Sequence, residues 1–244
     1  PQFYDGDVNT GDPQLGATLL FQPILPIPIH GSGDGEWRLA SRPVIPIIFS
    51  EPIPTGFDNF DHKSGIGDIQ LPVLLNLPDR YSGNFLLGAG AVGLLPTATD
   101  DDLGQDQWAL GPAVVLGYKT KFLTAGVFPN YFWKVGSNGQ DDDTPDISQG
   151  SLLYFCIFNL PNAWQIGMNP TITYDNNAAS GNQWNVPVGL FVSKTAKVGK
   201  IPVKFQLGVE YSVVRQDTFG QEAQIKLNII PVIPSLIKHP IFGG

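Results

Sequence analysis

The sequence predicts an all-β protein, and within that class a transmembrane antiparallel β-barrel of about twelve strands. Three observations support this. Apolar and polar residues alternate with a period of two along most of the chain. The alternating segments are longer than strands of soluble proteins, which typically have about 5–6 residues. Glycine and proline supply 28 and 22 of the 244 residues, which disfavours a helical protein.

The alternation is clearest near the C-terminus. Over residues 203–212 and 222–229, apolar side chains occupy the odd positions and polar or small residues the even ones. Eleven such segments, of about 10–14 residues each, occur along the chain, and a tilted membrane-crossing strand needs roughly 9–11. The predicted strands are residues 18–29, 36–48, 66–76, 84–96, 107–118, 122–134, 148–158, 164–175, 182–194, 201–213 and 221–233.

The connections between these segments alternate in length. Short turns at one rim and longer loops at the other are typical of outer-membrane barrels. The longer connections, which we expect at the cell surface, are residues 49–65, 97–106, 135–147, 176–181 and 214–220. The short turns and both termini are then periplasmic, which requires an even number of strands. We therefore expect a single domain over 1–244, with a partial first strand within residues 1–15 and a C-terminal tail over 234–244.

Aromatic residues and prolines bear on this interpretation in opposite directions. Aromatic residues lie near the ends of the segments, where membrane barrels carry aromatic girdles, although a large soluble β protein could also place them there. They are Trp37, Phe85, Trp108, Trp133, Trp164, Tyr174, Trp184 and Tyr211. Prolines also fall inside predicted strands, so we expect either bulges or shorter strands at these positions. They are Pro23, Pro43, Pro46, Pro72, Pro112, Pro129, Pro170, Pro187 and Pro202.

Several segments, taken in order, resemble one protein family. They are FQPILPIPI (21–29), EWRLASRPVIPII (36–48), SGIGDIQ (64–70), LLPTATDDDLGQDQWALGPA (94–113) and QWNVPVGLFVSKTAKVGKIPV (183–203). The resemblance is to Gram-negative outer-membrane proteins described as transporters or as meta-pathway phenol-degradation proteins, which include small twelve-stranded channel barrels. It implies localisation in the bacterial outer membrane and hints at small aromatic or other organic compounds as solutes.

Composition and motifs argue against other functions. The net charge of −8 disfavours binding to nucleic acid, and the single cysteine, Cys156, excludes a disulfide within the chain. A GxGxxG pattern at 88–93 is followed by Pro96 rather than by a helix, so small residues packed on a strand explain it better than a nucleotide site. We expect no enzymatic activity and no cofactor.

Two acidic clusters are weak candidates for metal sites. They are Asp100, Asp101 and Asp102, and Asp141, Asp142 and Asp143. Carboxylates bind hard cations such as Ca²⁺, but neither cluster has the spacing of an EF-hand, so solvated loop charge is the default interpretation. These carboxylates could also meet the divalent ions that bridge lipopolysaccharide.

Polar residues on the strands give the candidate site. If the apolar faces meet lipid, the polar faces line a lumen, because Arg or Lys facing lipid at mid-depth costs about 2–4 kcal/mol. The predicted pore-lining residues are Arg38, Arg42, Asp68, Gln70, Gln165, Asn169, Thr171, Lys204, Gln206, Glu210, Gln224 and Lys226. Among them Arg38, Arg42, Lys204 and Lys226 would form a basic stripe, with Asp68 and Glu210 as the nearest counter-charges and a mild preference for anions.

The sequence thus predicts a monomeric outer-membrane channel for passive diffusion of small solutes, in contact with lipid and lipopolysaccharide. Two alternatives remain open. One is a structural or adhesive barrel with a plugged lumen, and the other is a soluble all-β binding protein or enzyme.

Overall fold

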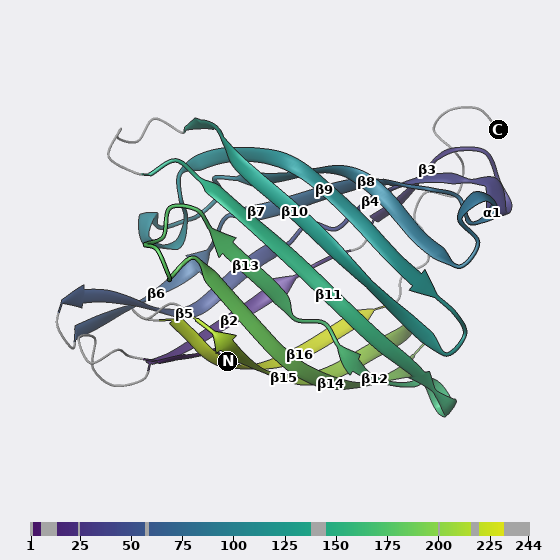
Figure 1. Ribbon diagram of the computed structural model, residues 1–244. Coiled ribbons are helices and arrows are strands. Elements are labelled where there is room, and N and C mark those ends of the chain that lie inside the picture. Colours follow the sequence, from purple (N-terminus) through teal and green to yellow (C-terminus); the bar gives the residue numbers. More distant parts are fainter. Residues whose placement is uncertain are drawn as a thin grey trace.

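The computed structural model describes residues 2–5, 14–23, 25–56, 59–137, 145–199, 201–215 and 220–231. Most of these residues lie in strands that join in one extended antiparallel sheet, which curves around a common axis (Figure 1). The helical elements described are α1 (Asp79–Ser82) and the 3-10 turns η1 (Gly33–Gly35), η2 (Asp101–Leu103) and η3 (Pro161–Ala163). Among the described residues, no helix is both long enough and apolar enough to cross a membrane. The prediction of an all-β protein is confirmed.

The strands follow the predicted segments closely in the second half of the chain and less closely in the first. Their bounds are β1 (Gln2–Asp5), β2 (Gln14–Phe21), β3 (Leu25–His30), β4 (Trp37–Ser41), β5 (Ile45–Gly56), β6 (Asn59–Ile66), β7 (Ile69–Asn76), β8 (Phe85–Leu95), β9 (Gln107–Lys119), β10 (Leu123–Ser137), β11 (Ser148–Leu160), β12 (Trp164–Met168), β13 (Thr171–Asp175), β14 (Trp184–Val198), β15 (Ile201–Val214) and β16 (Gly220–Pro231).

Strand pairing follows the order of the chain. β7 to β11 pair as successive antiparallel neighbours, as do β14 to β16. β1 lies between β16 and β2, with Gln2 opposite both Gln224 and Gly16. It occupies the place where the sequence analysis expects an additional strand within residues 1–15.

Three predicted segments, 18–29, 36–48 and 164–175, are each divided into two strands. β2 pairs with β5, and β5 pairs in turn with β6. β3 pairs with β4, and β4 pairs in turn with β7. The expectation of a long loop over 49–65 is wrong, because β5 and β6 extend through most of it as a hairpin (Figure 1). Pro52 and Pro54 are the reason that the sequence does not predict a strand here, although both lie within β5. Beyond Ser50, β5 pairs only with β6 among the described strands, and an edge tolerates a missing N–H donor.

Prolines also explain the break between β12 and β13. Asn169 and Pro170 separate the two strands. β12 pairs with β14 as far as Phe191, and β13 pairs with β14 again at Asn185. Proline supplies no ladder donor, and Pro187 lies on β14 inside this unpaired stretch. The Tyr154 hydroxyl of β11 donates a hydrogen bond of 2.8 Å to the Pro187 carbonyl oxygen. A side chain from β11, the strand beyond β12 and β13, therefore reaches across the break to a backbone acceptor of β14.

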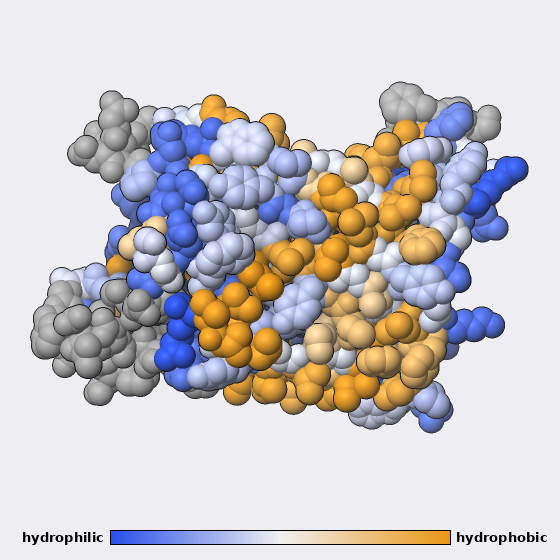
Figure 2. Space-filling view, in the orientation of Figure 1, coloured by the Kyte–Doolittle hydropathy of each residue, from blue (hydrophilic) through white to orange (hydrophobic). Residues whose placement is uncertain are grey.

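The two faces of the sheet differ in polarity, and the usual arrangement is reversed, because apolar side chains are exposed and polar side chains are buried. On β15 the odd residues from Phe205 to Val213 are exposed, whereas Gln206, Gly208, Glu210 and Ser212 between them are buried. Large apolar side chains are likewise exposed on β14 and β16, Leu190 and Leu227 among them. In the view of Figure 2, hydrophobic residues form a broad band across the middle of the molecule, and hydrophilic residues gather at both ends. We call the face with the buried polar residues the inner face.

Candidate functional site

The inner face of β12, β14, β15 and β16 carries a wall of polar side chains. Ser193, Gln206 and Ser212 are each at most 3% exposed, although all three are polar. Their burial follows from the period of two, because the outward positions between them hold valine, leucine and tyrosine. Buried polar groups require hydrogen-bond partners, and much of this wall supplies its own.

The predicted pore residues on these strands lie together. The Gln165 amide donates to Asn159 Oδ1 at 2.7 Å and accepts from the Ser193 hydroxyl at 3.2 Å. Gln206 lies 3.5 Å from Asn169 Oδ1. Thr171 and Gln224 are half-buried on β13 and β16, within the same part of the sheet.

An ion pair occupies the centre of this polar wall. The Lys226 ammonium lies 2.6 Å from Glu210 Oε1, and the Glu210 side chain is only 7% exposed. The two residues are diagonal neighbours, because Glu210 lies opposite Gln224 on β16 and Gly189 on β14. A Cβ on Gly189 would lie 2.6 Å from Glu210 Cγ and 2.2 Å from a backbone oxygen, so only glycine leaves room for the carboxylate.

The expected basic stripe is not formed by four free cations. Lys226 is paired with Glu210, and Arg38 is paired with Glu36 at the start of β4. The Arg42 guanidinium donates to the Gln22 side-chain oxygen. Lys204 lies over the ring of Phe191, 5.6 Å from its centroid. Neighbours that sequence spacing does not reveal therefore neutralise or engage these side chains.

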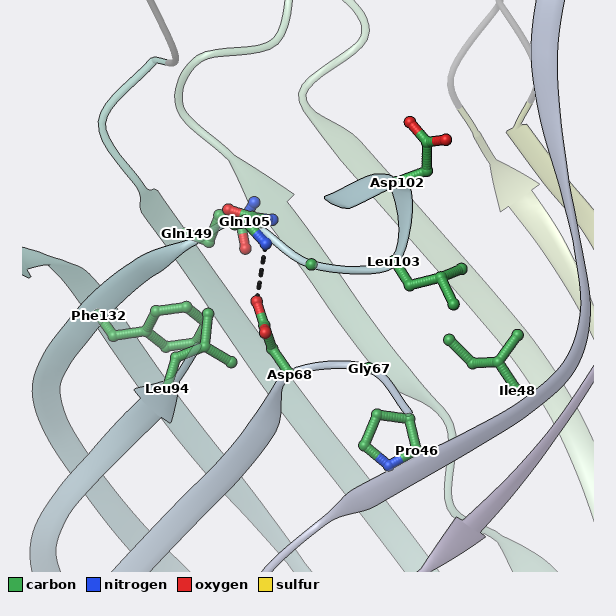
Figure 3. Close-up of a pocket in the computed structure, with 11 residues that line it drawn as sticks. Pro46, Ile48, Gly67, Asp68, Leu94, Asp102, Leu103, Gln105, Phe132 and Gln149 are labelled. Carbon is green, nitrogen blue, oxygen red and sulfur yellow. Dashed lines mark hydrogen bonds between the residues drawn. The ribbon is translucent and has the colours of Figure 1, made fainter. Parts of the chain in front are cut away.

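Asp68 has a different role from the predicted one of a counter-charge. Its carboxylate accepts hydrogen bonds from the backbone N–H groups of Thr97, Ala98 and Gln105, at 3.0, 3.1 and 2.8 Å. These three donors lie in the connection between β8 and β9, which Asp68 thereby folds towards the inner face (Figure 3). We call residues 96–106 the inturned loop. The carboxylate therefore holds this loop through neutral donors instead of acting as a counter-charge of the basic stripe.

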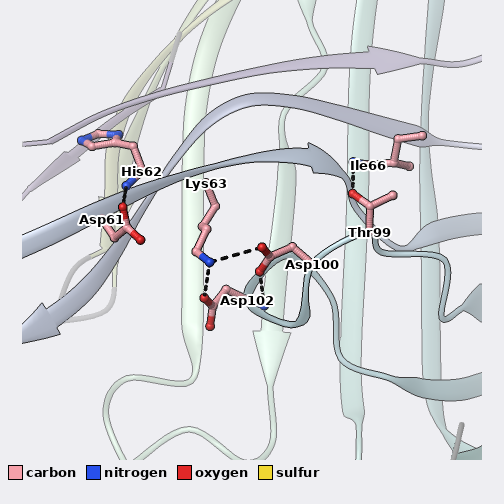
Figure 4. Close-up of polar contacts among 7 residues, drawn as sticks. All are labelled: Asp61, His62, Lys63, Ile66, Thr99, Asp100 and Asp102. Atoms are coloured by element: carbon pink, nitrogen blue, oxygen red, sulfur yellow. Dashed lines mark hydrogen bonds and ion pairs between the residues drawn. The ribbon is translucent and has the colours of Figure 1, made fainter.

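Lys63 of β6 anchors the tip of the inturned loop. Its ammonium lies 3.2 Å from Asp100 and 3.4 Å from Asp102, and the Thr99 hydroxyl accepts from the Ile66 N–H nearby (Figure 4). The lysine thus occupies the position between two carboxylates where a metal ion would bind. Among the described residues, no group of three or more His, Cys, Asp or Glu is arranged to hold a metal. Asp141, Asp142 and Asp143, the second candidate cluster, lie outside the described residues.

The next connection is tied to the same region by Gln107. This side chain is 3% exposed; it donates to the Pro145 carbonyl at 3.0 Å and accepts from the Ile147 N–H at 2.9 Å. Lys63 and Gln107 were not among the predicted site residues. Lys63 lies within the predicted loop 49–65 and Gln107 directly follows the predicted loop 97–106, and nothing in a period-two pattern marks a polar residue as a loop anchor.

The Lys63–Asp100 contact gives a pH-dependent prediction. The Asp102 N–H and the Lys63 ammonium lower the pKa of Asp100 below its usual 3.8, and the Asp100 carboxylate raises the pKa of Lys63 above 10.5. The stabilisation from Asp100 is present above pH 3.8 and is lost as pH falls through the lowered value. That from Lys63 is present below pH 10.5 and is lost above the raised value.

We expect a nitroxide at Asp101→Cys, in a Cys156→Ser background, to stay immobile between these limits and to become mobile below pH 3.8. In Lys63→Met the label should be mobile at neutral pH; equal mobility in both proteins would contradict the anchor.

A cavity of about 390 Å³ lies beneath the inturned loop. Its lining residues come from β5, the β6–β7 junction, β8, the loop, β10 and β11, so distant parts of the chain meet there (Figure 3). They are Pro46, Ile48, Gly67, Asp68, Leu94, Asp102, Leu103, Gly104, Gln105, Phe132 and Gln149.

Comparisons of the chain with protein-family models, with curated proteins and with solved structures give no significant match.

Proposed function

We propose that the chain is an outer-membrane β-barrel of twelve antiparallel strands through which small solutes diffuse passively. The observation that carries this proposal is the reversed polarity of the sheet. Burying Gln206 and Ser212 while exposing Leu207 and Val213 is unfavourable in water. It is favourable where the outer face meets lipid and the inner face forms the polar interior of a barrel.

Strand pairing supports the number twelve. β12 and β13 follow each other directly along the chain and both pair with β11 and β14. β2 with β3, β4 with β5, and β6 with β7 also follow each other directly, and strands of each of these pairs pair with strands of the next. Counted as four bent strands, they join the eight remaining strands in an unbroken order of twelve. In the proposed barrel, the pairing of β1 with both β16 and β2 joins the first strand to the last.

Aromatic residues near the strand ends support a membrane span of the required height. Trp108 and Tyr118 lie ten residues apart on β9, and Trp164 and Tyr174 lie ten residues apart along β12 and β13. Ten residues rise about 33 Å along a strand. At a tilt of about 40° this corresponds to a height of about 25 Å, the height of the apolar band in outer-membrane barrels.

The aromatic residues cluster by rim. Phe85 packs edge-on against Tyr118 with centroids 5.4 Å apart, and Phe122 lies 5.5 Å from Phe158, all beside short turns. Tyr174 lies 4.7 Å from Trp184 beside the opposite, long-connection end. We propose that this second end faces the exterior of the cell and that the solutes include small organic compounds, as the family resemblance implies.

Detergent extraction and conductance test the proposal. We expect the protein to stay with the membrane fraction until detergent is added, and to give discrete conductance steps in planar bilayers. Solubility without detergent would overturn the barrel. A barrel without conductance would instead favour a plugged structural role, for which the hydrogen bonds among Gln165, Asn159 and Ser193 provide a rigid inner wall.

A further inference from the structure

We infer that the cavity beneath the inturned loop binds small neutral organic molecules that combine an apolar body with a hydroxyl or amide group. The inference rests on the proposed channel function and names the class of solute that such a channel would select. Cavities that bind small molecules typically measure about 300–1,000 Å³ and combine an apolar lining with a few polar groups. The volume of about 390 Å³ falls within this range.

The apolar part of the cavity is built from four elements. Ile48 comes from β5, Leu94 from β8, Leu103 from the inturned loop and Phe132 from β10. Phe132 is only 6% exposed and belongs to a buried apolar cluster with Val92, Ala109, Ala113 and Ile147. This cluster continues the cavity along the inner face of β8, β9 and β10, opposite in character to the polar wall of β14 to β16.

The polar part of the cavity combines two amides with two carboxylates that are already engaged. Gln105 and Gln149 line it, and the Gln149 amide donates a long hydrogen bond, of 3.4 Å, to Asp175. The Asp68 carboxylate is engaged by three backbone N–H groups, and the Asp102 carboxylate lies 3.4 Å from Lys63. An anionic ligand would lose hydration and face these two carboxylates, whereas a neutral hydroxyl can bond to either amide.

The inturned loop makes the site conditional on its anchors. Leu103, Gly104 and Gln105 form one side of the cavity, and Asp68 and Lys63 hold this segment in place. A Cβ on Gly104 would lie 2.3 Å from Ala98 Cβ and 2.8 Å from Asp68 Oδ1, so the loop packs closely around the capping carboxylate. The side of the cavity that the loop forms therefore has a fixed shape.

Protection of an engineered thiol tests the site without requiring conduction. In a Cys156→Ser background, Gln105→Cys places a thiol at the cavity, and Asp79→Cys places one on exposed α1 as a control. Three ring compounds serve as probes: cyclohexanol is neutral with an apolar body, cyclohexanecarboxylate is charged, and myo-inositol is polar all round. We expect millimolar cyclohexanol to slow maleimide modification at position 105 at least threefold, with no change at position 79. The other two compounds should have no effect at either position.

Variants of the apolar lining complete the test. Phe132→Ala should abolish the protection, whereas Phe191→Ala, which removes an inner-face phenylalanine outside the cavity lining, should retain it. If Phe132→Ala does not fold, Leu103→Ser in the loop serves the same purpose. Absence of protection by cyclohexanol, or equal protection by cyclohexanecarboxylate or at position 79, would overturn the site. Protection in a protein that does not conduct would support the site while overturning the channel.

Discussion

Replacing Leu207 with lysine is expected to destabilise the membrane-inserted protein by about 2–4 kcal/mol, the cost of a lysine that faces lipid at mid-depth. Leu207 is 53% exposed at the middle of β15, where it lies opposite Leu227 and Val192. In a soluble protein the same change would place a charge in water and would cost within about 0.5 kcal/mol. The measurement is the free energy of unfolding by urea from lipid vesicles.

A control at the rim makes this result specific. Val198 is 55% exposed at the end of β14, next to a short turn. Because the cost of lysine falls to about 0–1 kcal/mol near the membrane interface, Val198→Lys should be tolerated. Equal effects of the two substitutions on the free energy of unfolding would contradict the proposed membrane span, whether both are tolerated or both destabilise the protein.

Breaking the Glu210–Lys226 pair is expected to have the second large effect. Lys226→Gln leaves a carboxylate that is 7% exposed without its cation, and such uncompensated charges cost about 3–5 kcal/mol when fully buried. Because Lys226 itself is 26% exposed, we expect a value near the lower end, about 3 kcal/mol. The double substitution Glu210→Gln with Lys226→Gln should cost less than Lys226→Gln alone. Unfolding of the wild type, the two single variants and the double variant would measure this.

The same variants should change ion selectivity if the inner face lines a conducting lumen. Lys226→Gln leaves the negative charge of Glu210 uncompensated, so the reversal potential under a salt gradient should shift towards cation selectivity. Glu210→Gln should shift it towards anion selectivity, and the double variant should resemble the wild type. Strictly additive stability effects together with unchanged reversal potentials would show that the pair does not act as a unit at the lumen.

Sequence reasoning succeeds where the structure is set by local alternation. The outward position of Leu207, Val209 and Tyr211 follows from the period of two, because a strand turns successive side chains to opposite faces. The same rule placed Gln206, Glu210 and Lys226 on one face. Their mutual contact additionally needed the register of β15 against β16, in which Glu210 lies opposite Gln224.

Sequence reasoning fails where prolines act through their position in the sheet. The period of two does not distinguish Pro52 and Pro54, which β5 tolerates at an edge, from Pro170, which separates β12 from β13. The difference lies in whether a neighbouring strand needs the missing N–H donor. That depends on strand pairing and not on the residues adjacent in sequence.

By itself, the sequence determined the all-β class, the approximate course of most strands and the two faces of the sheet, because each of these follows from alternation over a few neighbouring residues. The tertiary structure decided the inturned loop and its cavity. Asp68 reaches the backbone of Thr97, Ala98 and Gln105, and Lys63 reaches Asp100, across some thirty or more positions of the chain. Such contacts satisfy hydrogen-bond donors and charges that only the folded chain brings together, so no local pattern distinguishes Asp68 as a loop anchor from Asp68 as a pore charge.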